Sequence, residues 1–82
     1  MFNLREAQIN ERLVIQEIQG LEQQIEYLKN VGIRVGREIM VVAEGSLPGS
    51  LLVQVGDVRL HLNRDAINRI MVEEKSKTLI KK

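Results

Sequence analysis

The chain has 82 residues, of which 44% are hydrophobic, 28% are charged and 2% are aromatic. A chain of this length forms one domain with a small core, and the absence of cysteine excludes a disulfide framework, a thiolate metal site and a thiol nucleophile. No apolar run approaches the roughly 18 residues that a membrane span needs, and the first residues lack the apolar core of a signal peptide. We therefore expect a cytoplasmic protein without membrane insertion.

The charged residues are distributed unevenly. The formal net charge is +1, but residues 1–74 contain eight basic against eleven acidic side chains, a net charge of −3. Nucleic-acid binding needs clustered Lys and Arg, and single-strand binders also stack bases on aromatic rings, of which the chain has only Phe2 and Tyr27. We therefore expect no nucleic-acid partner. We predict one folded domain over residues 1–74 and a flexible Lys-rich tail over residues 75–82.

The first part of the chain predicts a helical turn, a strand and a helix. Asn3 favours a helical turn over residues 3–7, because its side chain can cap free N–H groups. Residues 12–18 predict a strand whose apolar residues do not alternate, which indicates a bulge or a strong curl. Apolar residues at helical spacing then predict a helix over residues 21–31, with Gly20 as its N-cap.

Two glycines four residues apart connect this helix to the next strand. Glycine readily adopts the left-handed conformation that ends many helices, and Gly32 stands where such a residue is needed. Leu28 and Ile33 then occupy the two positions whose side chains touch in a Schellman ending. Gly36 fits the third position of a type II turn over residues 34–37, which requires a positive φ.

The remaining sequence predicts short strands. In chain order, we expect a strand over residues 37–44, a loop over 45–50, strands over 51–55 and 58–62, a helical turn over 64–69 and a strand over 70–72. The pair Gly56-Asp57 is a two-residue hairpin signal. A two-residue turn at Gly56-Asp57 sets a strand register in which Val53 faces Leu60 and Val55 faces Val58. We expect the apolar residues of this hairpin to share one buried face.

Five short strands with one inserted helix predict a protein that is mainly β, a small closed or nearly closed barrel with short N- and C-terminal helical turns. An open sheet packed on one helix is the alternative fold.

One set of residues resembles a known family. Leu28, Gly32, Ile33, Gly36, Ile39 and Val41 form the frame Leu-x-x-x-Gly-Ile-x-x-Gly-x-x-Ile-x-Val. This frame resembles the FeoA family of small accessory proteins of bacterial ferrous-iron uptake, and the resemblance extends from about Leu4 to about Glu73. It implies an SH3-like β-barrel. It also implies association with the membrane permease FeoB, whose cytoplasmic part is a GTPase, by docking and not by turnover of a substrate.

The sequence contains no catalytic constellation, so we expect a protein that is not an enzyme. The single histidine, His61, is interpreted as an outward strand residue, with a role as divalent-metal ligand as the alternative. Glu22 and Glu26 lie one helical turn apart and could share a cation, although surface glutamates are usually only solvated. Such metal sites need about three or four protein ligands. We expect no cofactor, and at most weak binding of Fe²⁺ or another divalent metal.

Four apolar residues are candidates for a partner-binding surface. Leu47 lies beside Pro48 in a loop that we expect to be exposed. Met40 and Val42 alternate with the residues of their strand that face the core, so they face away from it. We expect the helix to cover Met40 and Val42. If the helix does not cover them, they form a partner surface. An apolar surface of this kind also allows weak homo-oligomers.

Three functions remain open. The first is a FeoA-like accessory module that binds a FeoB-like permease. The second is a regulatory module that resembles the C-terminal SH3-like domain of iron-dependent repressors of the diphtheria-toxin-repressor type, although the chain carries no DNA-binding helix-turn-helix. The third is a nucleic-acid-binding SH3-like barrel, which the acidic body and the scarcity of aromatic residues disfavour.

Overall fold

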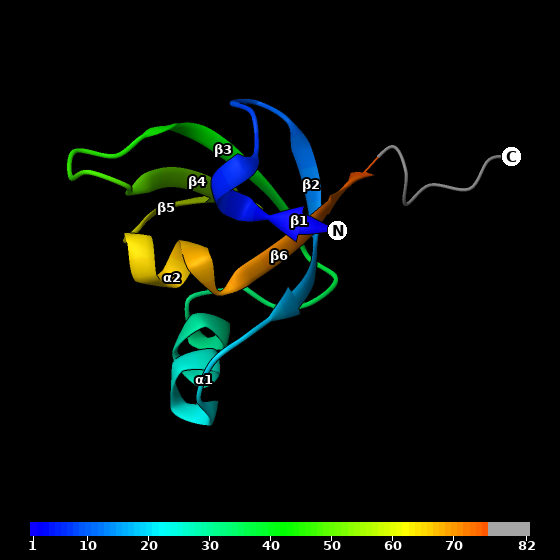
Figure 1. Cartoon of the computed structure of the whole chain (residues 1–82). Coiled ribbons are helices and arrows are strands. Elements are labelled where there is room, and N and C mark those ends of the chain that lie inside the picture. Colours follow the sequence, from blue (N-terminus) through cyan, green and yellow to red (C-terminus); the bar gives the residue numbers. More distant parts are fainter. Residues whose placement is uncertain (76–82) are drawn as a thin grey trace, which may run out of the picture.

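The computed structural model describes residues 1–75, which form one curled sheet with a helix at its lower end (Figure 1). The elements in chain order are β1 (Phe2–Asn3), η1 (Leu4–Glu6), β2 (Arg12–Ile18), α1 (Glu22–Asn30), β3 (Glu38–Glu44), β4 (Leu51–Val55), β5 (Val58–Leu62), α2 (Arg64–Asn68) and β6 (Ile70–Glu74). The strands form one six-stranded sheet in the order β1-β6-β2-β3-β4-β5. The prediction of a mainly β protein with one inserted helix and short helical turns is confirmed.

The sheet has one strand more than predicted. Phe2 and Asn3 form β1, which pairs with Val72 and Met71 of β6. We did not predict β1, because two residues are too few to show a period of two. The last strand also extends to Glu74, past the predicted end at residue 72, since β6 pairs with β2 as well as with β1. Of the predicted tail, residues 76–82 lie outside the described part of the chain.

The core is aliphatic and is enclosed by the curled sheet, η1 and α2. Buried residues come from nearly every element: Leu4, Leu13, Ile15, Leu28, Ile33, Ile39, Val41, Val53, Val55, Leu62, Ile67, Ile70 and Val72. The strand β2 carries the predicted irregularity, because its register against β6 shifts between Ile15 and Glu17. Such a bulge increases the local twist and so favours the curl of the sheet.

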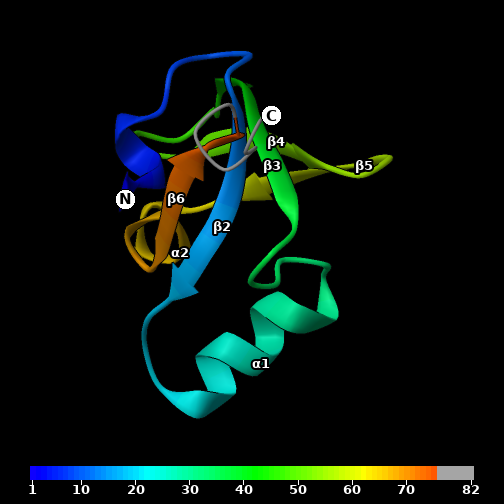
Figure 2. The same ribbon diagram turned by 90° about the vertical axis from the view of Figure 1, so that its right-hand side faces the viewer.

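The helix α1 lies at one end of the sheet, below β2 and β6 (Figures 1 and 2). Its N-cap is Leu21 rather than the predicted Gly20. Gly20 has a φ of +129°, so it belongs to the connection that precedes the helix. The Gln24 side chain accepts a hydrogen bond of 2.8 Å from the Leu21 N–H, as the third helical residue does when Leu21 is the N-cap.

The helix ends as predicted. Gly32 has a φ of +103° and donates its N–H to the Lys29 carbonyl at 3.0 Å, while Ile33 donates to the Leu28 carbonyl at 2.8 Å. These two bonds define a Schellman motif. Gly36 has a φ of +93°, and the N–H of Arg37 donates to the carbonyl of Arg34 at 3.1 Å, as the predicted type II turn requires.

The hairpin of β4 and β5 has the predicted register, with Val53 opposite Leu60 and Val55 opposite Val58. The expectation that all its apolar residues are buried is only partly correct. Val53 is fully buried and Leu60 is half-buried, but Val58 is 53% exposed. Val58 follows directly after the turn, so its side chain lies at the hairpin tip, where the core ends.

Candidate partner-binding surfaces

The loop between β3 and β4 is a defined turn that presents an apolar tip. The N–H of Ser50 donates to the carbonyl of Leu47 at 3.0 Å, and Gly49 has a φ of +80°. With Pro48 in the second position, these features are those of a type II turn. The N–H of Gly45 donates to the carbonyl of Ser50 at 2.8 Å and closes the base of the loop.

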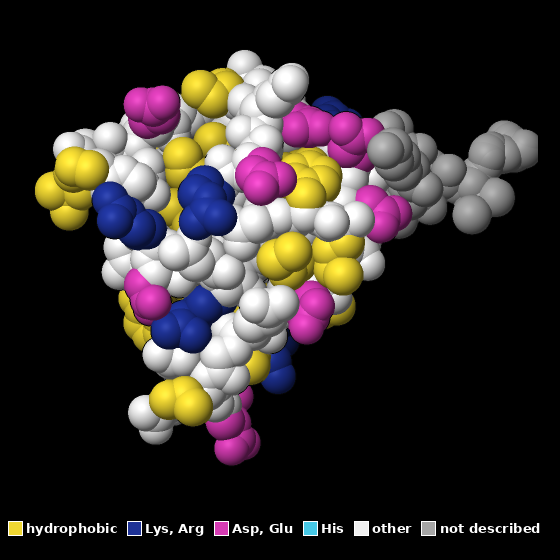
Figure 3. All heavy atoms as spheres, in the orientation of Figure 1, with side chains coloured by type: hydrophobic (Ala, Val, Ile, Leu, Met, Phe, Trp, Pro, Cys, Tyr) yellow, Lys and Arg dark blue, Asp and Glu magenta, His cyan; other side chains and the backbone are white. Residues whose placement is uncertain are grey.

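The side chain of Ser50 fixes the tip further. Ser50 is buried, and its Oγ donates to the Leu47 carbonyl at 2.6 Å and accepts from the Leu47 N–H at 3.2 Å. The backbone of Leu47 is therefore held on both sides, while the Leu47 side chain is 68% exposed. Figure 3 shows hydrophobic atoms projecting at the outer end of this loop. We call Leu47 and Pro48 the loop tip.

Met40 lies in a different place, in a hollow on the outer face of the sheet. The lining of this hollow comprises Arg12, Arg37, Glu38, Ile39, Met40, Gln54 and Gly56, and includes no residue of α1. The helix therefore does not cover Met40, contrary to our expectation. The reason is that α1 lies at the end of the sheet and not across this face (Figure 2).

Val42 lies at an irregularity of β3. The register against β4 shifts between Val41 and Ala43, so Val42 has no partner residue there, and it is half-buried. Met40 lies near the start of β3, whereas the loop tip follows its end. Met40 and the loop tip therefore do not form one surface, and the partner-binding role of the four candidate residues remains a prediction.

The candidate metal ligands are spread over two elements. His61 is exposed on β5, opposite Leu52 of β4, and Glu22 and Glu26 line a shallow hollow on α1 together with Leu21 and Gln23. Within residues 1–75, no group of three or more His, Cys, Asp or Glu residues is placed to hold a metal ion. A site with the usual number of protein ligands is therefore absent from this part of the chain.

No local pattern in the sequence predicts the polar and basic residues around Met40. Arg37 directly precedes the strand of Met40, but Arg12 and Gln54 are brought beside Met40 only by the pairing of β2, β3 and β4. The hairpin register that we predicted links only Gln54 to Arg59. A prediction of the register between Arg12 and Met40 would have been needed to find this surface.

Comparison with known proteins identifies a family for almost the whole chain. Residues 2–74 match the model of the FeoA domain. No curated protein sequence matches significantly. Among the solved structures, FeoA of Stenotrophomonas maltophilia complexed with zinc, a procaryotic SH3 domain protein, is 30% identical. The match covers 89% of this chain and 91% of that chain, with a TM-score of 0.74. The predicted SH3-like fold is therefore confirmed.

Two further structures share this fold at lower identity. The crystal structure of an iron uptake regulatory protein (FeoA) is 23% identical, covers 89% of this chain and 95% of that chain, and has a TM-score of 0.78. A manganese-dependent transcriptional repressor is 19% identical and has a TM-score of 0.79, with 88% of this chain and 40% of that chain covered. These TM-scores establish a common fold, and at identities below 25% they establish nothing further. Within the described residues, no helix combines the length and hydropathy needed to cross a membrane.

Proposed function

Because the chain belongs to the FeoA domain family of ferrous-iron transport, we propose that it is a cytoplasmic accessory protein that binds the cytoplasmic part of a FeoB-like permease. The family membership supports an accessory role without catalysis. A protein of this kind acts on the permease only if it binds one of the permease's conformations more tightly than another. The proposed mechanism is therefore a docking that shifts the permease between conformations.

The loop tip is the observation that carries this proposal. Leu47 is 68% exposed although its backbone is fixed by Ser50. Burying a leucine side chain contributes about 1.5–3 kcal/mol. A contact made by a fixed loop also loses less conformational entropy than one made by a flexible loop. An apolar side chain held in this way is suited to enter a pocket of a protein partner.

Divalent metal binding has at most a weak role in this proposal. The Stenotrophomonas FeoA structure contains zinc, but the candidates in the present chain, His61, Glu22 and Glu26, do not form a group of three ligands within the described residues. One imidazole or one pair of surface carboxylates binds a divalent ion weakly.

The alternative is a regulatory module like the corresponding part of a metal-dependent repressor. The similarity to the manganese-dependent repressor supports a shared fold. In residues 1–75 the two α-helices are separated by β3, β4 and β5, so this part of the chain has no helix-turn-helix. We therefore favour the transport accessory over a DNA-binding regulator.

The test is a calorimetric titration of the cytoplasmic part of the FeoB-like permease from the same organism. We expect binding that Leu47→Asp weakens by about tenfold or more, because the apolar contact is lost and a charge is buried. Leu21→Asp is the matched control, since Leu21 is 63% exposed but lies on the helix side of the molecule. Absence of binding would overturn the proposed partner, and equal weakening by both variants would overturn the role of the loop tip.

A further inference from the structure

Four residues form a row across the outer face of the sheet. Arg12 of β2 pairs with Met40 of β3, Met40 pairs with Gln54 of β4, and Gln54 pairs with Arg59 of β5. Opposed residues of neighbouring antiparallel strands point to the same face. The row is thus a half-buried methionine and a glutamine between two exposed arginines. We call these four residues the cross-strand row.

The middle of the row is hollowed. A hollow of about 330 Å³ opens beside Met40 and Gln54, and Gly56 occupies the next position on the same face of the chain after Gln54. Gly56 has no side chain to fill this space, and a Cβ placed on it would lie 3.3 Å from an Arg37 guanidinium nitrogen. The hollow therefore has an apolar floor at Met40 and basic groups at its rim.

The basic groups at this hollow are only partly neutralised. Glu38 is the one acidic residue in its lining, and its carboxylate accepts a hydrogen bond of 3.1 Å from Lys75. The guanidinium of Arg12 lies farther from Glu38, at 3.8 Å, and the Arg12 side chain is 71% exposed. A surface ion pair of that length contributes little. Arg12 is therefore open to a second carboxylate.

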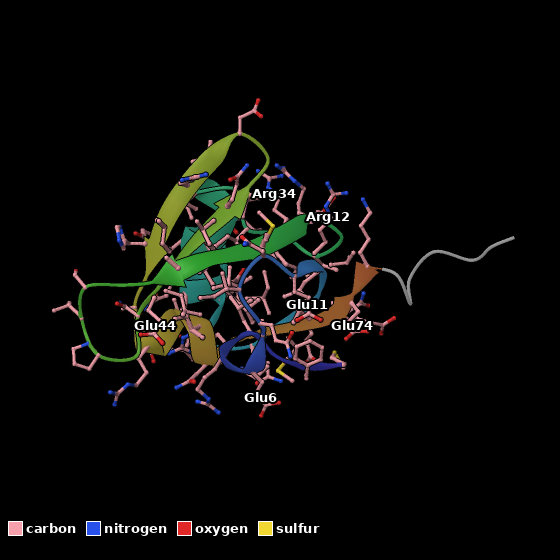
Figure 4. The ribbon with its side chains drawn as sticks, turned by 90° about the horizontal axis from the view of Figure 1, so that it is seen from above. Glu6, Glu11, Arg12, Arg34, Glu44 and Glu74 are labelled. Atoms are coloured by element: carbon pink, nitrogen blue, oxygen red, sulfur yellow. The ribbon has the colours of Figure 1, made fainter. Side chains whose placement is uncertain are left out.

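Some of the charged residues lie on opposite sides of β3. Seen from above, Arg12 and Arg34 lie on the side of the β4–β5 hairpin, and the labelled glutamates lie on the other side: Glu6, Glu11, Glu44 and Glu74 (Figure 4). Although residues 1–74 carry a net charge of −3, the face with the cross-strand row is locally positive. A positively charged face attracts and orients an acidic partner.

We propose that the cross-strand row binds an extended acidic segment of a protein partner, with the pattern acidic-x-apolar-x-acidic. The inference rests on the proposed function only in assuming that the chain acts by binding a protein. The apolar side chain of the acidic segment would enter the hollow and contact Met40, and the two carboxylates of the segment would bind Arg12 and Arg59. Arginine is suited to this role because its planar guanidinium can bind a carboxylate through two hydrogen bonds.

The dimensions of the row fit this pattern. Arg12 and Arg59 are separated by three strand spacings of about 4.8 Å, which is about 14 Å. In an extended segment the first and fifth residues are separated by four steps of about 3.3 Å, which is about 13 Å. The first, third and fifth side chains of such a segment also point to one face. The two acidic residues and the apolar residue between them therefore reach the row together.

Other occupants of this face fit less well. A second copy would bring the arginines of two rows together, which is unfavourable. Single-stranded nucleic acid needs aromatic stacking platforms, and Phe2 and Tyr27 lie on β1 and α1, away from the row. The observations therefore favour an acidic protein segment.

The test is a titration of the full ¹⁵N-labelled chain with the peptide Gly-Ser-Glu-Thr-Leu-Thr-Glu-Ser-Gly, followed by amide chemical shifts. We expect the shifts to centre on the outer face of β2, β3, β4 and β5. The double variant Arg12→Gln/Arg59→Gln should weaken the affinity by about tenfold or more, because charge-assisted hydrogen bonds are lost. Arg5→Gln/Arg64→Gln removes the same charge from η1 and α2 and should leave the affinity within about twofold. Met40→Ala should also weaken binding, through loss of the apolar floor.

A second peptide tests the spacing. Gly-Ser-Thr-Glu-Leu-Glu-Thr-Ser-Gly has the same composition, but its glutamates point away from the face of its leucine. We expect it to bind more weakly than the first peptide. Equal binding of the two peptides, or equal loss in both double variants, would overturn the proposed pattern. Two further outcomes would also overturn the proposal. If oligothymidylate binds more tightly than the peptide, the occupant is nucleic acid. If the amide shifts of the row depend on protein concentration without peptide, the occupant is a second copy.

The same variants separate this inference from the proposed function. If the peptide fails to bind while the permease fragment binds the wild type and the Arg12→Gln/Arg59→Gln variant equally, the inference is wrong and the proposed function stands. If the peptide binds with the expected specificity and the permease fragment does not bind, the inference stands and the proposed partner is wrong.

Discussion

Leu28 and Ile33 are joined across Gly32 by a hydrogen bond of 2.8 Å from the N–H of Ile33 to the carbonyl of Leu28. Their side chains are 2% and 0% exposed, and Leu28 is the one buried residue of α1. The junction is therefore the place where the helix is anchored to the core. Gly32 makes it possible, because its φ of +103° lets the backbone reverse within two residues.

Gly32→Val should destabilise the protein clearly. A residue with a Cβ pays about 1–2 kcal/mol in the left-handed region, and a branched residue pays more. The cost is conformational, since a Cβ at Gly32 would meet no atom within 4 Å. For a domain of this size, each kcal/mol lowers the melting temperature by about 4–8 °C. Thermal unfolding followed by circular dichroism measures the effect.

The control for this variant is Ser46→Ala, an exposed position in the β3–β4 loop whose change should stay within about 0.5 kcal/mol. Gly45 of the same loop is unsuitable, because a Cβ there would overlap the Ser50 side chain and approach the Ser50 backbone to 3.0 Å. Equal melting of Gly32→Val and Ser46→Ala would show that the left-handed conformation at Gly32 is not needed.

Leu62 and His61 are neighbours on β5 that point to opposite faces, so they test the register of the hairpin. Leu62 is 5% exposed and faces Leu51, whereas His61 is exposed. Leu62→Ala should cost about 2–5 kcal/mol of unfolding free energy as a core truncation. His61→Ala should change it by less than about 0.5 kcal/mol. Urea unfolding of both variants measures the difference, and the reverse order would mean that the register is shifted by one residue.

Local features of this fold could be predicted from the sequence because each depends on neighbouring residues. The Asn3 cap accepts from the Arg5 N–H at 2.9 Å, and the Gly32 ending and the Gly56-Asp57 hairpin follow from the conformations of single residues. The pairing of Arg12 with Met40 links residues 28 positions apart, and no local signal specifies it. The position of α1 at the end of the sheet likewise depends on contacts made only in the folded chain. The loop tip was thus predictable, and the basic surroundings of Met40 were not.

Removal of divalent metal should not change the stability of the protein. The chain has one histidine and no cysteine, and the described residues contain no group of three acidic or histidine ligands, so no closed structural metal site can stabilise residues 1–75. We expect the same melting temperature with and without a chelator. A clear decrease with chelator would contradict this, and His61→Ala and Glu22→Gln would then be compared for the loss of metal binding.

Ser50→Ala should weaken the proposed permease contact without removing any group that touches the partner. The hydroxyl of Ser50 bonds both the N–H and the carbonyl of Leu47, so its loss loosens the loop tip, although the bond from the Ser50 N–H to the Leu47 carbonyl remains. Ordering a mobile side chain on binding costs about 0.5–1.5 kcal/mol, which corresponds to a loss of about two- to tenfold in affinity. Calorimetry with the permease fragment measures this loss. Unchanged affinity together with a lowered melting temperature would show that the serine stabilises only the fold.

Salt should separate the two surfaces. The loop tip is apolar, and the contact that we propose for Leu47 and Pro48 contains no ion pair, so its affinity should change little between low and physiological salt. The acidic peptide on the cross-strand row should lose affinity over the same range, because its contacts with Arg12 and Arg59 are exposed ion pairs, which salt weakens. Titrations of the permease fragment with the wild type and with Arg12→Gln/Arg59→Gln at both salt concentrations test this. If salt weakens binding to the wild type but not to the variant, the permease also contacts the row. If salt weakens both equally, the apolar contact at Leu47 is not what holds the complex together.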